Sequence, residues 1–194
     1  MKYQMMSLMI LIVFYAVYLG KMIIQKKQGI TTNQIAKDKK NKHRYHIEII
    51  MKIATYSIIC IEVISILLGT TLFSPIIRNI GILLGVLGDA IFLSAVVTMG
   101  SSWRAGIAAQ DHRQLITKGI FHISRNPAFL GFDLMYISIL IMFFNPILLF
   151  WTLLTIIMLH LQILQEEKYL IQEFGEDYLK YKQDVYRYLG VKIR

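Results

Sequence analysis

The feature that most constrains the fold is a series of apolar runs, each long enough to cross a lipid bilayer as one helix. About 20 mostly apolar residues span a bilayer. Three such runs lie in the first hundred residues, at about 5–24, 47–73 and 80–99. A fourth stretch, about 128–164, is too long for one span and contains Asn145-Pro146. Because proline cannot donate a backbone hydrogen bond and disfavours helix in the residue before it, we expect two helices there.

The sequence therefore predicts an all-α polytopic membrane protein with about five transmembrane helices. Hydrophobic residues make up 56% of the chain and charged residues only 17%, whereas a soluble domain is about half apolar and a quarter charged. Helices four and five, about 129–144 and 147–164, would form a hairpin. The charged tail, 165–194, should extend the fifth helix and then form a second short helix.

The basic residues predict how the chain is oriented in the membrane. The net charge is +9. Five spans place the polar segments 25–46 and 100–127 and the tail on one side, and these regions hold nearly all the lysines and arginines. By the positive-inside rule that side is cytoplasmic, so the N-terminus lies outside and the C-terminus and site lie inside. We interpret the positive charge as a determinant of membrane topology and as a source of attraction to membrane lipids. We expect no nucleic-acid partner.

The chain divides into two predicted parts. Residues 1–75 would form N-terminal membrane helices with a basic cytoplasmic loop, and residues 76–194 would form the core that holds a cytoplasmic cofactor pocket and the tail. Three small residues recur on one face of the third helix, which is typical of close helix packing. These residues are Gly81, Gly85 and Gly88.

Ionisable residues within the apolar runs are few. We interpret Glu62 and Asp89 as polar contacts between helices, and His160 as the source of a core hydrogen bond. Asp133 lies one turn past Phe129, within possible reach of a pocket. The sequence has neither HExxH nor CxxC, and we expect no metal site.

The hairpin brings two polar segments to the same side of the membrane. Residues 100–127 precede the fourth helix, and Glu166 and Glu167 follow the fifth, so Arg125 should lie near both glutamates. Two interpretations remain open on spacing alone. The three charges pair at the membrane boundary to lower their desolvation cost, or they bind a zwitterionic ligand.

Several ordered motifs resemble those of the isoprenylcysteine carboxyl methyltransferase family. They are WRAGI at 103–107, RQLITKGIF at 113–121 and SRNPAFLG at 124–131. The tail adds EEKYL at 166–170, and then FGEDY at 174–178 with Tyr181. The resemblance covers roughly residues 95–190.

The resemblance implies a membrane enzyme that transfers a methyl group from S-adenosylmethionine to a lipid-attached carboxylate and releases S-adenosylhomocysteine. The acceptor, a lipid or a prenylated small molecule or protein, would enter from the bilayer. Arg125 and Glu167 match the family's catalytic arginine and glutamate. The residues implied to hold the cofactor are Gln110, His112, Arg113, Gln114, Leu115, Ile116, Phe121, Asn126, Pro127, Phe129, Glu166 and Glu167.

The chain departs from the family pattern at four positions. Phe121 and Phe129 stand where the family often has tyrosine, and Asn126 stands where eukaryotic members have histidine. Ile163 replaces an arginine that eukaryotic members associate with substrate. This last departure leaves open an acceptor other than a farnesylated cysteine.

Three alternative functions differ in chemistry. A phospholipid amine N-methyltransferase would share the cofactor but not the acceptor. A sterol-type reductase would use NADPH with a similar hairpin and tail. A non-enzymatic lipid-binding adaptor would bind no nucleoside cofactor at all.

Overall fold

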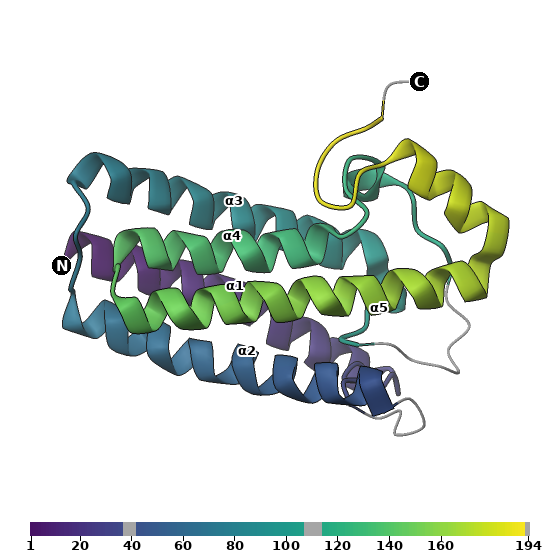
Figure 1. Ribbon diagram of the computed structural model, residues 1–194, viewed down its shortest axis with the longest axis horizontal. Coiled ribbons are helices and arrows are strands. Elements are labelled where there is room, and N and C mark those ends of the chain that lie inside the picture. Colours follow the sequence, from purple (N-terminus) through teal and green to yellow (C-terminus); the bar gives the residue numbers. More distant parts are fainter. Residues whose placement is uncertain (37–41, 107–113, 193–194) are drawn as a thin grey trace.

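The computed structural model describes residues 1–36, 42–106 and 114–192, and its long elements are all helices. Figure 1 shows five helices side by side, with the C-terminal segment gathered at one end of the bundle. They are α1 (Lys2–Lys27), α2 (Lys42–Leu68), α3 (Pro75–Met99), α4 (Pro127–Met142) and α5 (Pro146–Asp184), with short 3-10 turns η1 (Gly100–Ser102) and η2 (Gly119–His122).

The prediction of an all-α polytopic membrane protein is confirmed. Four helices are long and apolar enough to cross a membrane, namely α1, α2, α3 extended through η1, and α5. The fifth apolar helix, α4, has only 16 residues. A helix rises about 1.5 Å per residue, so α4 is about 24 Å long, short of a hydrocarbon core of about 30 Å. One end of α4 therefore lies within protein, at the site described below.

All three prolines of the chain begin a helix. Pro75, Pro127 and Pro146 occupy the first positions of α3, α4 and α5. Proline is tolerated there because the first amide of a helix has no partner within the helix. At the hairpin, the Asn145 side chain accepts a hydrogen bond from the Leu148 amide at 2.9 Å. This cap separates α4 from α5 and confirms the predicted break.

The glycine stripe packs α3 closely against α4. A Cβ atom built on Gly88 would lie 3.0 Å from the Gly131 carbonyl oxygen of α4 and 3.1 Å from the Met135 amide nitrogen. At Gly85 the added atom would lie 2.5 Å from the Ser138 hydroxyl oxygen. The backbones thus approach too closely for larger residues, which confirms the helix-packing interpretation.

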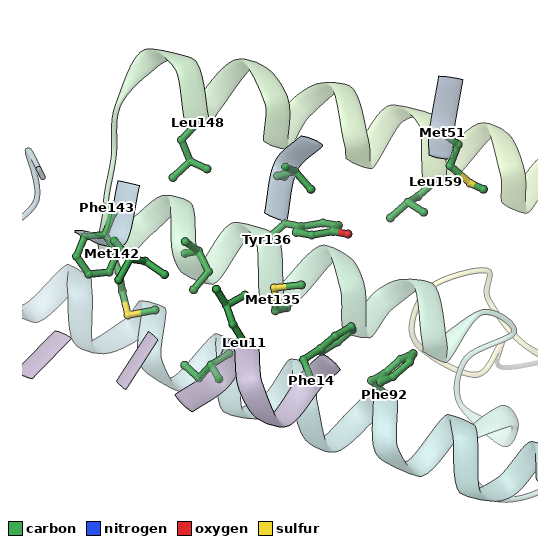
Figure 2. Close-up of a cluster of buried hydrophobic side chains, with 14 of the residues drawn as sticks. Leu11, Phe14, Met51, Phe92, Met135, Tyr136, Met142, Phe143, Leu148 and Leu159 are labelled. Carbon is green, nitrogen blue, oxygen red and sulfur yellow. The ribbon is translucent and has the colours of Figure 1, made fainter. Parts of the chain in front are cut away.

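Aromatic side chains fill the centre of the bundle. The ring of Phe14 in α1 stacks on Phe92 of α3 with centroids 4.3 Å apart, and meets Phe132 of α4 edge-on at 4.7 Å. Figure 2 shows Phe14 and Phe92 close together, and Tyr136 in the space between α4 and α5.

The α5 helix continues well beyond the membrane and then turns. Gly175 has φ 51° and ψ −124°, a conformation that glycine adopts at little cost. The helix therefore breaks there, and residues 176–184 form a second short helical piece (Figure 1). The predicted tail, an extended fifth helix followed by a short helix, is confirmed.

The N-terminal helices are attached to the segment that leads into the site. The Gln34 amide donates to the Ala105 carbonyl at 2.7 Å, and the Ala105 amide donates to Thr32 at 3.0 Å. Gln25 of α1 adds a hydrogen bond from its side-chain amide to the Trp103 carbonyl at 3.0 Å. The division of the chain at residues 75 and 76 stays a prediction.

Candidate functional site

A cavity lies where η2, the start of α4 and the far part of α5 meet. We call it the cap cavity; it encloses about 860 Å³ including its open mouth. Arg125 and eight of the residues predicted to hold a cofactor line it: Gln114, Leu115, Ile116, Phe121, Asn126, Pro127, Phe129 and Glu166. Gln110, His112 and Arg113 lie outside the described residues. Tyr169, Phe174 and Tyr178 add aromatic walls that the site prediction omitted.

Arg125 and Glu167 form a buried ion pair beside this cavity. The Nη2 atom of Arg125 lies 3.2 Å from Oε1 of Glu167, with the two side chains only 5% and 4% exposed. The predicted proximity of Arg125 to the glutamate pair is thus confirmed. Glu167 is not among the residues that line the cavity, whereas its neighbour Glu166 is. The two glutamates therefore occupy different environments.

A second arginine, Arg187, also binds Glu167. Its Nε donates to Oε1 at 3.0 Å and its Nη2 donates to Oε2 at 2.9 Å, a bidentate pair. The hydrogen bond to Glu167 raises the pKa of the Arg187 guanidinium above its ordinary value, so this arginine stays charged. Arg187 was not predicted from the sequence, because it lies beyond α5 and no sequence pattern connects it with Glu167.

The C-terminal segment holds this arrangement in place. The Arg125 amide donates to the Tyr186 carbonyl at 3.1 Å, and the Gly190 amide donates to the Ile123 carbonyl at 2.7 Å. The Tyr188 hydroxyl lies 2.7 Å from Nδ1 of His160 in α5. The hydrogen bond expected of His160 is therefore confirmed, with a partner in the tail.

Arg125 lines the cap cavity and has hydrogen-bond donors that are not paired. Its Nε and Nη1 atoms are buried and have no hydrogen-bond partner among the described residues. A guanidinium presents five N–H donors in a planar fork that matches a carboxylate. Leaving buried donors unpaired is costly. The arrangement therefore suits a ligand that brings a carboxylate to Arg125.

A second cavity lies deeper in the bundle, between the helices. We call it the membrane chamber; it encloses about 820 Å³ including its openings, and residues from all five long helices line it. Its walls are mostly aromatic and aliphatic, including Tyr18, Phe92 and Leu159. The two cavities share the wall residues Trp103, Arg104, Ala128, Phe129 and Glu166. The cap cavity, which has Arg125 and Asn126 in its wall, thus meets the more apolar membrane chamber at Phe129 and Glu166.

The other ionisable residues of the helices lie apart from the cap cavity. Asp133 is 8% exposed and lines neither cavity, so it does not reach the pocket. Glu62 is fully buried, but neither of its carboxylate oxygens has a hydrogen-bond partner in the part of the chain that the structure describes. The polar contact between helices that we expected of Glu62 therefore includes no hydrogen bond among the described residues. Within the described ranges, no group of three histidine, cysteine or acidic residues could hold a metal ion.

A part of the chain that contributes to both cavities matches a known family. Residues 80–172 match the sequence model of the isoprenylcysteine carboxyl methyltransferase (ICMT) family. This part of the chain is therefore similar to the ICMT family. The matched region runs from α3 into the extension of α5, so it includes Arg125 and both glutamates but ends before Arg187.

Individual relatives agree with this similarity. The chain is 31% identical over 117 residues to protein-S-isoprenylcysteine O-methyltransferase B of Arabidopsis thaliana, a match that covers 56% of this chain and 57% of the relative. It is 32% identical over 108 residues to protein-S-isoprenylcysteine O-methyltransferase of Homo sapiens, covering 54% of this chain and 38% of the relative. The chain thus spans roughly half the length of the curated relatives it matches, or less.

Proposed function

We propose that this chain belongs to the ICMT family and is a membrane methyltransferase that moves a methyl group from S-adenosylmethionine to the carboxylate of a lipidic or prenylcysteine-like acceptor. The observation that carries the proposal is the meeting of two cavities at one wall, one that Arg125 and Asn126 line and one whose wall is mostly apolar. A polar cofactor fits the cap cavity, and a lipid tail fits the membrane chamber. The reacting groups would then meet beside Phe129 and Glu166.

The residues of the cap cavity suit each part of the cofactor. Phe121, Tyr169 and Phe174 offer aromatic surface to an adenine ring. Glu166 lines both cavities and can receive the ammonium group of the methionine part. When bound, S-adenosylmethionine supplies an electrophilic methyl group on a sulfonium. The negative charge of Glu166 near that position would favour its binding.

Arg125 would hold the carboxylate that receives the methyl group. A carboxylic acid is ionised near neutral pH, so its oxygen is already a nucleophile and needs no general base. The enzyme then acts mainly by holding two reactants in line, which supplies a large part of a rate enhancement. The unpaired Nε and Nη1 donors of Arg125 provide the required carboxylate contact.

Glu167 would act as a positioning residue rather than as a ligand of the cofactor. Its oxygens are engaged by Arg187 and Arg125, and its side chain is 4% exposed. Asn126 adds a long contact of 3.4 Å to Oε1. These contacts fix the direction of the Arg125 guanidinium. The pair Glu167 and Arg187 would thus orient Arg125 toward the carboxylate.

The charge pattern supports a cytoplasmic site. With five spans, the cap cavity, the α1–α2 loop and the C-terminus lie on the side that is rich in lysine and arginine. The cofactor would enter from the cytoplasm, and the acceptor would enter from the bilayer. The partners of the protein would then be a lipid or prenylated substrate and the surrounding membrane lipids.

Transfer of labelled methyl from S-adenosylmethionine tests the proposal directly. Detergent-purified protein would be incubated with farnesylcysteine analogues and with simple lipidic acids, and the product tested for base-labile ester. We expect ester formation that falls at least 100-fold in Arg125→Ala and is retained in Lys168→Ala, an exposed charge on the same side of the bundle. Ester formation at the normal rate in Arg125→Ala would refute the assignment of this residue.

The same assay separates the acceptor classes. An amine must lose its proton before it attacks, so N-methylation would rise steeply with pH, whereas a carboxylate shows no such step near neutrality. A flat profile between about pH 6 and 8 supports carboxyl methylation. A rising profile with a base-stable product supports the phospholipid amine alternative.

A further inference from the structure

A buried amide side chain lies in the wall of the membrane chamber on α5. Gln162 lines the chamber and is only 1% exposed. The buried residues beside it on α5, Leu159 and Ile163, are apolar. Burying an amide costs free energy unless the amide is hydrogen-bonded. The Gln162 side chain therefore needs a partner, and Glu166 supplies one.

The Gln162 amide holds one oxygen of the Glu166 carboxylate. Its Nε2 atom donates to Oε1 of Glu166 at 3.1 Å. An ionised carboxylate can only accept, so the amide nitrogen and not the amide oxygen must face it. The amide oxygen is buried and has no hydrogen-bond partner within the described ranges. An apolar residue would avoid that cost, so the N–H donor is what the amide contributes at this position.

Helix geometry directs Glu166 toward this donor. Residues four apart lie on one face of a helix, and their side chains lean toward its N-terminus. Glu166 therefore leans back over Gln162, and it lines both the cap cavity and the membrane chamber. A glutamate side chain has several rotatable bonds, and ordering it costs entropy. A hydrogen bond from a buried neighbour restricts these bonds before any ligand arrives.

The two adjacent glutamates are held by different kinds of donor. Glu167 binds two arginines, whose positive charges offset its own charge. Gln162 is neutral, so it orients Glu166 without adding a positive charge. A cation that binds Glu166 then meets no repulsion from the residue that holds the carboxylate. This kind of donor suits a carboxylate that binds a cationic group.

We propose that Gln162 is a positioning residue that fixes Glu166 in the orientation that receives the ammonium group of S-adenosylmethionine. This role rests on the proposed function, which assigns the ammonium contact to Glu166. Restricting a binding group in advance lowers the entropy cost of association. Gln162 should therefore strengthen the binding of the amino-acid part of the cofactor and leave the binding of its adenosine part unchanged.

Two ligands separate the amino-acid part from the adenosine part. S-adenosylhomocysteine has both parts, whereas 5′-methylthioadenosine lacks the amino-acid part. We would titrate the detergent-purified full chain with each ligand, as wild-type protein and as Gln162→Met, which keeps an unbranched side chain but has no donor. We expect S-adenosylhomocysteine to bind about fivefold more weakly in Gln162→Met, as the loss of one hydrogen bond would give. The affinity for 5′-methylthioadenosine should not change.

The matched control is Thr155→Val, about two helical turns from Gln162 on α5. Thr155 is fully buried and lines neither of the two cavities, and its hydroxyl has no hydrogen-bond partner in the part of the chain that the structure describes. This substitution also removes a buried polar atom from α5, so both affinities should stay at the wild-type level. A double-mutant cycle adds a second readout, because Gln162→Met should weaken S-adenosylhomocysteine binding no further in Glu166→Ala.

The outcomes separate this role from the proposed function. Equal losses for both ligands in Gln162→Met, no loss for either ligand, or a further loss in the Glu166→Ala background would overturn the positioning role. If 5′-methylthioadenosine binds too weakly to titrate, the cycle decides, and if Gln162→Met does not fold, Gln162→Leu takes its place. Any of these contrary results beside saturable S-adenosylhomocysteine binding in the wild-type protein would refute the role of Gln162 alone. No such binding in the wild-type protein would refute the proposed function and this role with it.

Discussion

The seam between α3 and α4 and the cap around Glu167 are held together in opposite ways. In the seam, Gly88 and Gly131 let two backbones touch. In the cap, Glu167 joins Arg125 and Arg187, which lie 62 residues apart in sequence. The seam therefore depends on the absence of side chains, whereas the cap depends on three side chains being present together.

The difference matters for function. A close-packed seam has few alternative arrangements, because interiors at this density do not deform smoothly. A charged cluster of this kind can tolerate substitution of its partly exposed residue, but not of its buried residues. We therefore expect substitutions in the seam to affect folding more than chemistry, and substitutions in the cap to affect both.

Glu167→Ala should have the largest effect. It leaves the Arg125 guanidinium buried without its counter-charge, and breaking a buried ion pair costs about 3–5 kcal/mol. Methyl-transfer activity should fall together with stability, because Arg125 loses its orientation. Thermal unfolding in detergent, followed by intrinsic fluorescence, would report the loss, and Lys168→Ala would serve as the exposed control. An unchanged melting temperature would show that the cap does not depend on this carboxylate.

Gly88→Ala should have the next largest effect. The added methyl group meets backbone atoms of Gly131 and Met135 that cannot move aside easily, and overpacking of this kind costs about 1–3 kcal/mol. Methyl transfer per folded molecule should stay near the wild-type level. The matched control is Gly20→Ala, where no atom lies within 4 Å of the added group. If both variants unfold at the same temperature, the seam is looser than described.

Arg187→Ala should have the smallest effect of the three. Its side chain is 31% exposed, so its pair with Glu167 is partly screened by water, and we expect a stability loss of about 1 kcal/mol. Methyl-transfer activity should fall by roughly tenfold if the orientation of Arg125 lowers the activation free energy by as much as one charged hydrogen bond contributes. Kinetics of Arg187→Ala against Arg187→Lys would test the orienting role. A loss as large as that of Arg125→Ala would instead indicate direct contact with a ligand.

The sequence predicted the seam and the helices well because both are local patterns. Apolar run length and the three prolines define the helices, and the spacing of Gly81, Gly85 and Gly88 defines the face of α3 that packs. The approach of Arg125 to Glu167 was also predictable, since a hairpin returns its two ends to one side of the membrane. These features need no knowledge of distant contacts.

The sequence did not predict which residue completes the cap around Glu167. Arg187 reaches Glu167 only because α5 bends at Gly175 and the chain after Val185 folds back over η2. Nor did it predict that Glu62 would be fully buried with no hydrogen-bond partner among the described residues. Both features arise from three-dimensional packing between segments far apart in the chain. The local sequence around each residue does not indicate which distant residues it contacts.

Calorimetric titration with S-adenosylhomocysteine, with NADPH in a parallel experiment, tests the central claim most directly. We predict saturable binding of S-adenosylhomocysteine at one site in the purified chain, at least tenfold weaker in Glu166→Ala and unchanged in Lys168→Ala. NADPH should show no saturable binding. Saturable NADPH binding without any S-adenosylhomocysteine signal would contradict the account and indicate a reductase.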